Sequence, residues 1–395
     1  MTTPDESCSQ PVWARPDAFA EAGEGWGWVD RKGNRHPCRD FEDLTESIIG
    51  DAGARVDMVW TPKGPNLVLP EELPELLPAL KEARLRWAEW EIEEGRRQML
   101  IFGVFFVGFL TYSLIAKQKL MAFGPLGLTL LLFLILGFIP WYQGMKRRKR
   151  ARMAIEGQLE PDVEGLRFET WLQHQRAPYT RLLLVTLGVV GLVQVVGPGN
   201  LLSDVRTAGL TKVNGAAADW WRLATAPFLH GHWLHFLMNA SALAYLGRRV
   251  ELLARWPHMV IVFVLAAWVG GEASARFLPG PSIGASGGII GLLGFLMVFE
   301  SMHPALVPDS VRRRLLAGLV MTAAIGMVGY RFVDNWAHGG GLVAGMAYAL
   351  IVFPKSSSAK RPDQTTGDRY AGYAALAVCA AAAAWAVQLL LSAGG

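Results

Sequence analysis

The stretch GASGGIIGLLGFLMVF, residues 284–299, contains no charged side chain and places Ser286 between small residues at its beginning. An apolar run of this kind, in a chain with several others, predicts a membrane helix. A serine flanked by glycines is unusual at the mouth of such a helix. We interpret Ser286 as a candidate nucleophile, and we ask which other residues position it.

The composition predicts a polytopic, all-α membrane protein with a small soluble domain. The chain of 395 residues is 52% hydrophobic and only 18% charged, which is too apolar for an ordinary soluble enzyme. Residues 1–24 are polar and lack an apolar centre, so we expect no cleavable signal peptide. Cys8, Cys38 and Cys379 lie far apart and form neither a metal-ligand spacing nor a disulfide framework.

The chain is expected to divide into successive parts. We predict a soluble cytoplasmic α+β domain at 1–98, a membrane hairpin with a basic juxtamembrane segment at 99–152, a cytoplasmic helical linker at 153–180, a six-helix core at 181–354, and a linker with a last transmembrane helix at 355–395. In the soluble domain we expect strands at 26–29 and 56–60 and a helix at 41–49. Its tryptophans are interpreted as core residues, and the alternative is a module that binds an unknown partner.

Basic residues set the predicted orientation in the membrane. The net charge is +4, but the basic residues lie beside apolar runs, which indicates membrane topology rather than nucleic acid as a partner. The hairpin runs 99–115 and 123–141 have basic residues at both open ends, and Lys146–Arg152 is interpreted as an anchor for anionic lipid headgroups. Core spans are expected at 181–196, 232–247, 259–271, 284–299, 315–328 and 336–353, with a last span at 371–391.

Alternate connections of the core carry the positive charge, after its second, fourth and sixth spans. By the positive-inside rule these connections and the N-terminus are cytoplasmic. The long connection at 199–230 and the beginning of the 284–299 span then face the outer side. Ser286 is therefore expected near the outer end of its helix.

Three spans carry polar residues at that depth. His235 and Asn239 are four residues apart and share one helix face, with His230 about one turn earlier, and His338 lies near the outer end of the sixth span. A centred charge in a span costs about 2.5–3.5 kcal/mol, so such residues are functional candidates. Each alone is also explained by helix packing or an interhelical hydrogen bond.

The combination fits acyl transfer. A serine nucleophile needs a base, and His338 is the candidate; the side chains of His235 and Asn239 and the Ser286 backbone N–H are candidate oxyanion donors. No acidic third member is expected at this depth, which predicts a dyad. Gly287 and Gly291, and Gly341 and Gly345, have the spacing of small residues that bring helices close together.

Other site chemistries have weaker support. His230, His232 and His235 have a spacing that can bind a metal, but no His-Glu-x-x-His is present and no carboxylate is placed to complete the site. We expect no metal. A transporter or channel would place polar groups through both halves of the bilayer, whereas here they gather on one side.

These motifs resemble those of the rhomboid family of intramembrane serine proteases. Gly284-x-Ser286-Gly287 resembles the family's nucleophile motif, and Ala337-His338-x-x-Gly341-x-x-x-Gly345 resembles its base motif. His235-x-x-x-Asn239, with His230, resembles its oxyanion motif. Trp221-Arg222 is similar to the pair that braces the long outer loop, and Glu251 falls at a structural glutamate. The resemblance covers about half the chain.

The resemblance implies a six-helix rhomboid core and hydrolysis of a peptide bond in or near the transmembrane helix of a membrane-protein substrate. It implies no cofactor, a location in the bacterial inner membrane and an active site open to the periplasmic side. Ile290 replaces an aromatic residue that stacks on the histidine in many members. The alternative is a catalytically inactive rhomboid-like protein that binds membrane clients. The loop Gly329–Asn335 is a candidate lid over His338.

Overall fold

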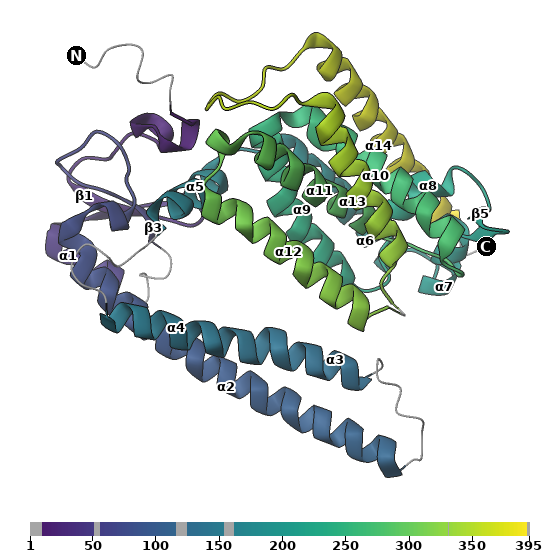
Figure 1. The fold of residues 1–395 in the computed structure, drawn as a ribbon, viewed down its shortest axis with the longest axis horizontal. Coiled ribbons are helices and arrows are strands. Elements are labelled where there is room, and N and C mark those ends of the chain that lie inside the picture. The colour runs from purple at the N-terminus through teal and green to yellow at the C-terminus, as the bar shows by residue number, and fades with distance from the viewer. Residues whose placement is uncertain (1–9, 51–55, 116–124, 154–161, 331, 393–395) are drawn as a thin grey trace. The chain divides into compact units, whose positions relative to one another are not determined.

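The computed structural model describes residues 10–50, 56–115, 125–153, 162–330 and 332–392 (Figure 1). The chain forms two compact units, which we describe separately: one consists of Val12–His174 and Ala323–Tyr330, the other of Met1–Pro11, Gln175–Thr322 and Arg331–Gly395. The turn between the predicted hairpin runs 99–115 and 123–141 lies outside the described residues, as does Cys8.

A small antiparallel sheet opens the N-terminal unit. Its strands are β1 (Trp26–Asp30), β2 (Arg35–Cys38) and β3 (Val56–Trp60), in the order β2-β1-β3. The turn between β1 and β2 forms because the Asp30 carboxylate accepts hydrogen bonds from the backbone N–H groups of Lys32 and Asn34, both at 2.8 Å. The strands predicted at 26–29 and 56–60 are therefore present.

Helices cover this sheet. The Asp40 side chain accepts a hydrogen bond from the Asp43 N–H at 2.9 Å and so caps α1 (Phe41–Ile49), which buries Leu44 and Ile48 against Val59. On α5 (Val163–His174), Arg167 donates to the carbonyls of Trp13 at 3.0 Å and Arg15 at 2.9 Å. The predicted linker region thus contains a helix that packs into the N-terminal domain.

The tryptophans of this domain differ in burial, and Trp26 and Trp28 pack partly buried against the core. Trp13 and Trp60 are buried, but Trp87 and Trp90 are 44% and 54% exposed and stack on each other with ring centroids 4.9 Å apart. Both lie on α2 (Leu77–Ile115), a helix of 39 residues. The prediction that the tryptophans are core residues is wrong for this pair, because helical spacing does not reveal which face of a long helix its domain covers.

The hairpin has two helical arms: α2 is the first, and the second runs without a break from 125 to 153. α2 packs against α3 (Pro125–Leu132), a π-helical segment (Phe133–Phe138) and α4 (Ile139–Met153). The helices approach closely at Gly95. A Cβ at this position would lie only 2.7 Å from the backbone nitrogen of Trp141. No residue in the apolar window of α2 is buried, so this surface is suited to lipid.

The second unit is a helical bundle with a small hairpin. Its elements are α6 (Pro178–Val196), α7 (Leu201–Ala208), β4 (Lys212–Val213), β5 (Ala216–Ala217), α8 (Arg222–Thr225), α9 (Trp233–Ala254), α10 (Trp256–Phe277), α11 (Ser286–Met302), α13 (Asn335–Val352) and α14 (Thr366–Ser392). α12 (Asp309–Val328) has residues in both units.

Five helical stretches of the described residues are long and apolar enough to cross a membrane: Pro74–Ile115, Thr129–Met153, Pro178–Val196, Trp256–Phe277 and Thr366–Ser392; α11 is apolar but shorter. The other predicted core spans are helices as well. The predicted class, a polytopic helical membrane protein with a small N-terminal α+β domain, is confirmed.

α11 lies at the centre of the bundle, packed against α10 and α13. Most of its residues are buried, including Phe295 and Phe299 at 0% exposure. A Cβ at Gly341 would overlap the backbone oxygen of Gly287, and a Cβ at Gly345 would overlap that of Gly291. α11 and α13 therefore meet backbone to backbone, as the spacing of these glycines predicts.

Buried polar side chains connect the bundle near the C-terminal ends of α9 and α11. Arg249 on α9 and Glu300 on α11 are 0% and 1% exposed and form a two-pronged ion pair with N–O distances of 2.6 and 2.7 Å. The Glu251 carboxylate accepts hydrogen bonds from the Thr180 N–H at 2.8 Å and hydroxyl at 2.7 Å. Glu251 thus satisfies free N–H groups in the first turn of α6.

Candidate active site

Ser286 is the first residue of α11 and is half-buried. The chain reaches it through Gly284, whose φ of +123° is one that L side chains rarely adopt. A Cβ at this position would also lie only 2.7 Å from the Cε1 atom of His235. Gly284 is therefore required both by the backbone conformation and by the close approach of α9.

His338 lies in the first turn of α13. Asp334 caps this helix, because its carboxylate accepts a hydrogen bond from the Ala337 N–H at 2.9 Å and its carbonyl accepts one from the His338 N–H at 3.1 Å. The contact of Gly287 with Gly341 brings the beginnings of α11 and α13 together. Within the described residues, no hydrogen bond joins the Ser286 hydroxyl to the His338 ring; catalytic hydrogen bonds often tighten only when substrate binds.

The residues proposed for the oxyanion lie on and just before α9. His232 caps this helix, and the rings of His230 and His235 meet edge to face with centroids 5.1 Å apart. A Cβ at Gly284 would lie 3.7 Å from the Asn239 amide nitrogen. That nitrogen is buried and has no hydrogen-bond partner among the described residues, an arrangement that costs stability unless a ligand accepts from it.

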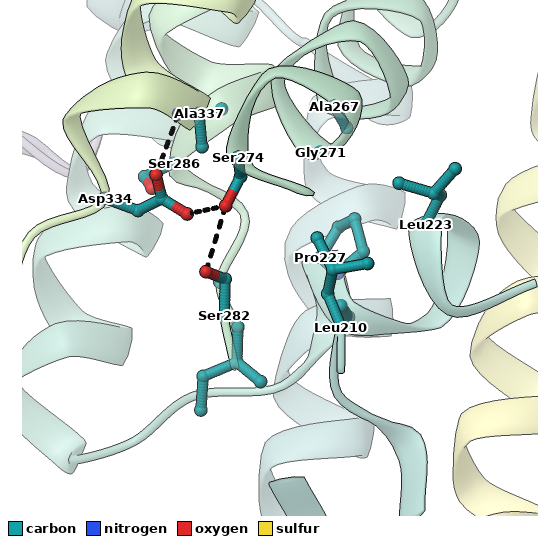
Figure 2. Close-up of a pocket in the computed structure, with 14 residues that line it drawn as sticks. Leu210, Leu223, Pro227, Ala267, Gly271, Ser274, Ser282, Ser286, Asp334 and Ala337 are labelled. Atoms are coloured by element: carbon teal, nitrogen blue, oxygen red, sulfur yellow. Dashed lines mark hydrogen bonds between the residues drawn. The ribbon is translucent and has the colours of Figure 1, made fainter. Parts of the chain in front are cut away.

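A cavity of about 40 Å3 connects several of these residues, and Ser286, Gly287, Asp334 and Ala337 all line it. Figure 2 shows Asp334 and Ser286 among the residues that line this cavity, with a chain of hydrogen bonds running from Asp334 through Ser274 to Ser282. The expectation that no acidic residue lies at the depth of Ser286 is therefore wrong. The sequence does hold one indication of this residue: an aspartate four residues before His338 has the spacing of an N-cap for the helix that carries His338.

A half-buried lysine completes this polar cluster. Lys212 of β4 donates to the hydroxyls of Ser274 at 2.7 Å and Ser282 at 2.8 Å and to the Leu278 carbonyl at 3.2 Å. Burial lowers the pKa of the Lys212 amine, and the nearby Asp334 carboxylate opposes that shift. The cluster links the long loop, α10 and the cap of α13.

The remaining residues singled out in the sequence lie at the edges of the site. Arg222 donates to the carbonyls of Arg206 and Gly209, both at 2.9 Å, and lies over the Trp221 ring. Ile290 is buried one turn after Ser286. The candidate lid Gly329–Asn335 includes residue 331, which lies outside the described residues.

Comparison with known proteins links this arrangement to one family. Residues 217–355 match the model of the Rhomboid domain. The chain is 27% identical over 189 residues to Rhomboid protease GluP of Bacillus subtilis (strain 168), a match covering 47% of this chain and 37% of the relative. It is 30% identical over 165 residues to RHOMBOID-like protein 4 of Arabidopsis thaliana, covering 40% and 41% of the two chains.

An inactive relative is also similar. Inactive rhomboid protein 1 of Rattus norvegicus is 32% identical over 145 residues, which cover 36% of this chain and 17% of the relative. The chain thus spans less than half the length of these three relatives.

Proposed function

The chain belongs to the rhomboid family, and on this premise we propose that it is an intramembrane serine endopeptidase in which Ser286 and His338 form the catalytic dyad. The Ser286 hydroxyl attacks the carbonyl carbon of the scissile peptide bond while His338 takes its proton. His338 then returns the proton to the leaving amine as the bond to nitrogen breaks. Water hydrolyses the acyl-enzyme in the same way and restores the Ser286 hydroxyl.

The observation that carries the proposal is the unpartnered amide of Asn239. It is buried, lies against Gly284, and has a donor that no atom of the described chain accepts. A tetrahedral intermediate formed at Ser286 supplies an oxyanion that accepts from such a donor. His235, His230 and the Ser286 backbone N–H are the other residues that we assign to this oxyanion site.

The substrates follow from the location of the site. The protein is integral to the membrane, and Ser286 begins an apolar helix, so the scissile peptide bond would lie in or near a substrate's transmembrane helix. We propose that the N-terminus is cytoplasmic, that the site opens to the outer side, and that the membrane is a bacterial inner membrane. Alternating basic connections support this orientation.

Purified protein in proteoliposomes tests the dyad. Ser286→Ala and His338→Ala should each abolish cleavage of a helical membrane substrate and leave the thermal unfolding midpoint near that of the wild type. Ser301→Ala, a serine at the other end of the same helix, should cleave normally. Normal cleavage by the Ser286 or His338 variant would exclude the dyad.

A catalytically inactive protein that binds membrane clients is the second candidate. It is favoured by the similarity to an inactive relative and by the lack of a Ser286–His338 hydrogen bond in the described structure. A fluorophosphonate probe separates the two functions, because only an activated serine reacts with it. Labelling that disappears in Ser286→Ala supports the protease, and no labelling of the wild type supports the client-binding protein.

A further inference from the structure

The C-terminal helix α14 packs along the bundle, outside the segment that matches the Rhomboid domain. Its buried face contains small residues at helical spacing: Gly372, Ala375, Cys379, Ala382, Ala383 and Ala386. Near the beginning of the helix, a Cβ at Gly372 would lie 2.7 Å from the Cβ of Pro257 on α10. α14 is therefore fixed to the bundle along its length rather than tethered beside it.

Trp385, near the other end of α14, contacts the long loop 199–230. Its ring stacks on Trp221 with centroids 5.1 Å apart and an interplanar angle of 28°, and Trp220 meets it edge-on at 6.4 Å. The Arg222 guanidinium lies 4.4 Å from the centre of the same Trp221 ring. Trp221 thus joins α14 to the arginine that organises the loop.

Arg222 carries the contact onward within the loop. Its side chain is 13% exposed and pairs with Asp219, while its guanidinium donates to the carbonyls of Arg206 and Gly209 at the end of α7. These carbonyls are among those that a helix end leaves without partners. The position of Arg222 therefore fixes α7 relative to α8.

The loop is in turn bonded to the segment that leads to Ser286. Leu210 and Ser282 exchange two backbone hydrogen bonds of 2.9 and 3.0 Å, and the Gly284 N–H donates to the Ala226 carbonyl at 3.0 Å. Gly284 precedes Ser286 by two residues. A continuous set of contacts therefore runs from Trp385 through the loop to the nucleophile.

We propose that Trp385 is a positioning residue, through which α14 holds the loop 199–230 and with it the segment 282–286 in the arrangement needed for catalysis. Trp385 acts through Trp221 and Arg222 and does not touch the reacting atoms. The kinetic part of this proposal rests on the proposed protease function. The structural part, that α14 orders the loop, does not.

Four variants test the contact: Trp385→Ala, Trp385→Phe, Trp221→Ala and the double alanine variant. Val378→Ala is the matched control, because Val378 lies on the same helix and is 47% exposed. Active enzyme is counted by fluorophosphonate titration, so that kcat refers to folded, reactive sites. Trp385→Ala should lower kcat roughly two- to tenfold, the range of one aromatic pair, and change KM less.

Trp385→Phe should recover most of the kcat, and Val378→Ala should match the wild type. If both rings act through one contact, the double variant should be little slower than Trp385→Ala alone. Fully additive losses, or a kcat per titrated site at the wild-type level in Trp385→Ala, would overturn the positioning role.

Hydrogen exchange of the full chain in nanodiscs gives a readout that does not need activity. Amides of residues 201–226 should exchange faster in Trp385→Ala than in the wild type and in Val378→Ala, whereas amides of α9 should be unchanged. Unchanged exchange in 201–226 would refute the ordering of the loop by α14. A wild type that neither cleaves nor labels would refute the protease function instead, and the exchange result would still decide the structural part.

Discussion

Replacing Asn239 by alanine should separate activity from stability. The Asn239 amide nitrogen is buried and finds no acceptor in the described part of the chain, so its removal takes away an unsatisfied donor whose burial costs about 1–3 kcal/mol. Loss of the packed side-chain atoms offsets part of that gain. We therefore expect the unfolding midpoint of Asn239→Ala to stay within a few degrees of the wild type, or to rise.

The catalytic activity of Asn239→Ala should fall, although its stability does not. One oxyanion donor is worth about 2.7–4 kcal/mol in the transition state, which corresponds to a loss of about 10²–10³ in kcat. The loss should fall at the lower end of that range because His235 and the Ser286 N–H remain. Fluorophosphonate labelling of Ser286 should persist, since the nucleophile and base are intact.

The assay is kcat for a helical substrate in proteoliposomes, normalised to titrated sites, with thermal unfolding followed in parallel. Glu251→Ala serves as the contrasting variant, because Glu251 bonds the first turn of α6: it should lower the unfolding midpoint and leave kcat per site nearly unchanged. An Asn239→Ala protein that unfolds much earlier, or that cleaves at the wild-type rate, would refute the oxyanion assignment.

Three other predictions concern features away from the reacting atoms. Gly345→Ala places a Cβ against the backbone of Gly291 and should cost about 1–3 kcal/mol of stability, which chemical denaturation will measure; a wild-type value would contradict the close approach. Arg249→Met removes the two-pronged ion pair of the buried Glu300 carboxylate and should cost about 3–5 kcal/mol, and adding Glu300→Leu should recover much of that loss. Burial raises the pKa of Asp30, but hydrogen bonds from its turn outweigh it and lower the pKa from 3.8 to about 2; this contribution to stability is present above about pH 4 and lost as the pH falls toward 2, and NMR titration against Asp30→Asn checks it.

Features set by local sequence were predictable. The turn at Asp30 and the helix capped by Asp40 depend on side chains that bond their own backbone within a few residues, so the pattern alone identifies them. The close approach of α11 and α13 was also predictable, because glycines four residues apart on each helix allow the two backbones to touch.

Features set by tertiary contacts were not predictable. Asp334 lines the same cavity as Ser286 only because the cap of α13 faces that cavity, and the sequence indicates the cap without indicating what it faces. In the sequence, Lys212 cannot be distinguished from a surface lysine. Its contacts with Ser274 and Ser282 depend on the position of β4 in the folded chain. The prediction for Trp87 and Trp90 was wrong because these side chains stay partly exposed in the described structure, which their spacing along α2 does not reveal.

The buried pair of Arg249 and Glu300 has a consequence for how the protein is made. Arg249 leaves the ribosome 51 residues before Glu300, so for that interval its guanidinium has no counter-ion. A charge at the centre of the bilayer costs about 2.5–3.5 kcal/mol, which an unpaired Arg249 avoids by remaining in the basic connection after the second predicted span. We therefore expect the end of α9 to stay at the aqueous boundary or in the insertion machinery until α11 arrives, so that the helix of Ser286 is also the helix that allows α9 to settle in the bundle.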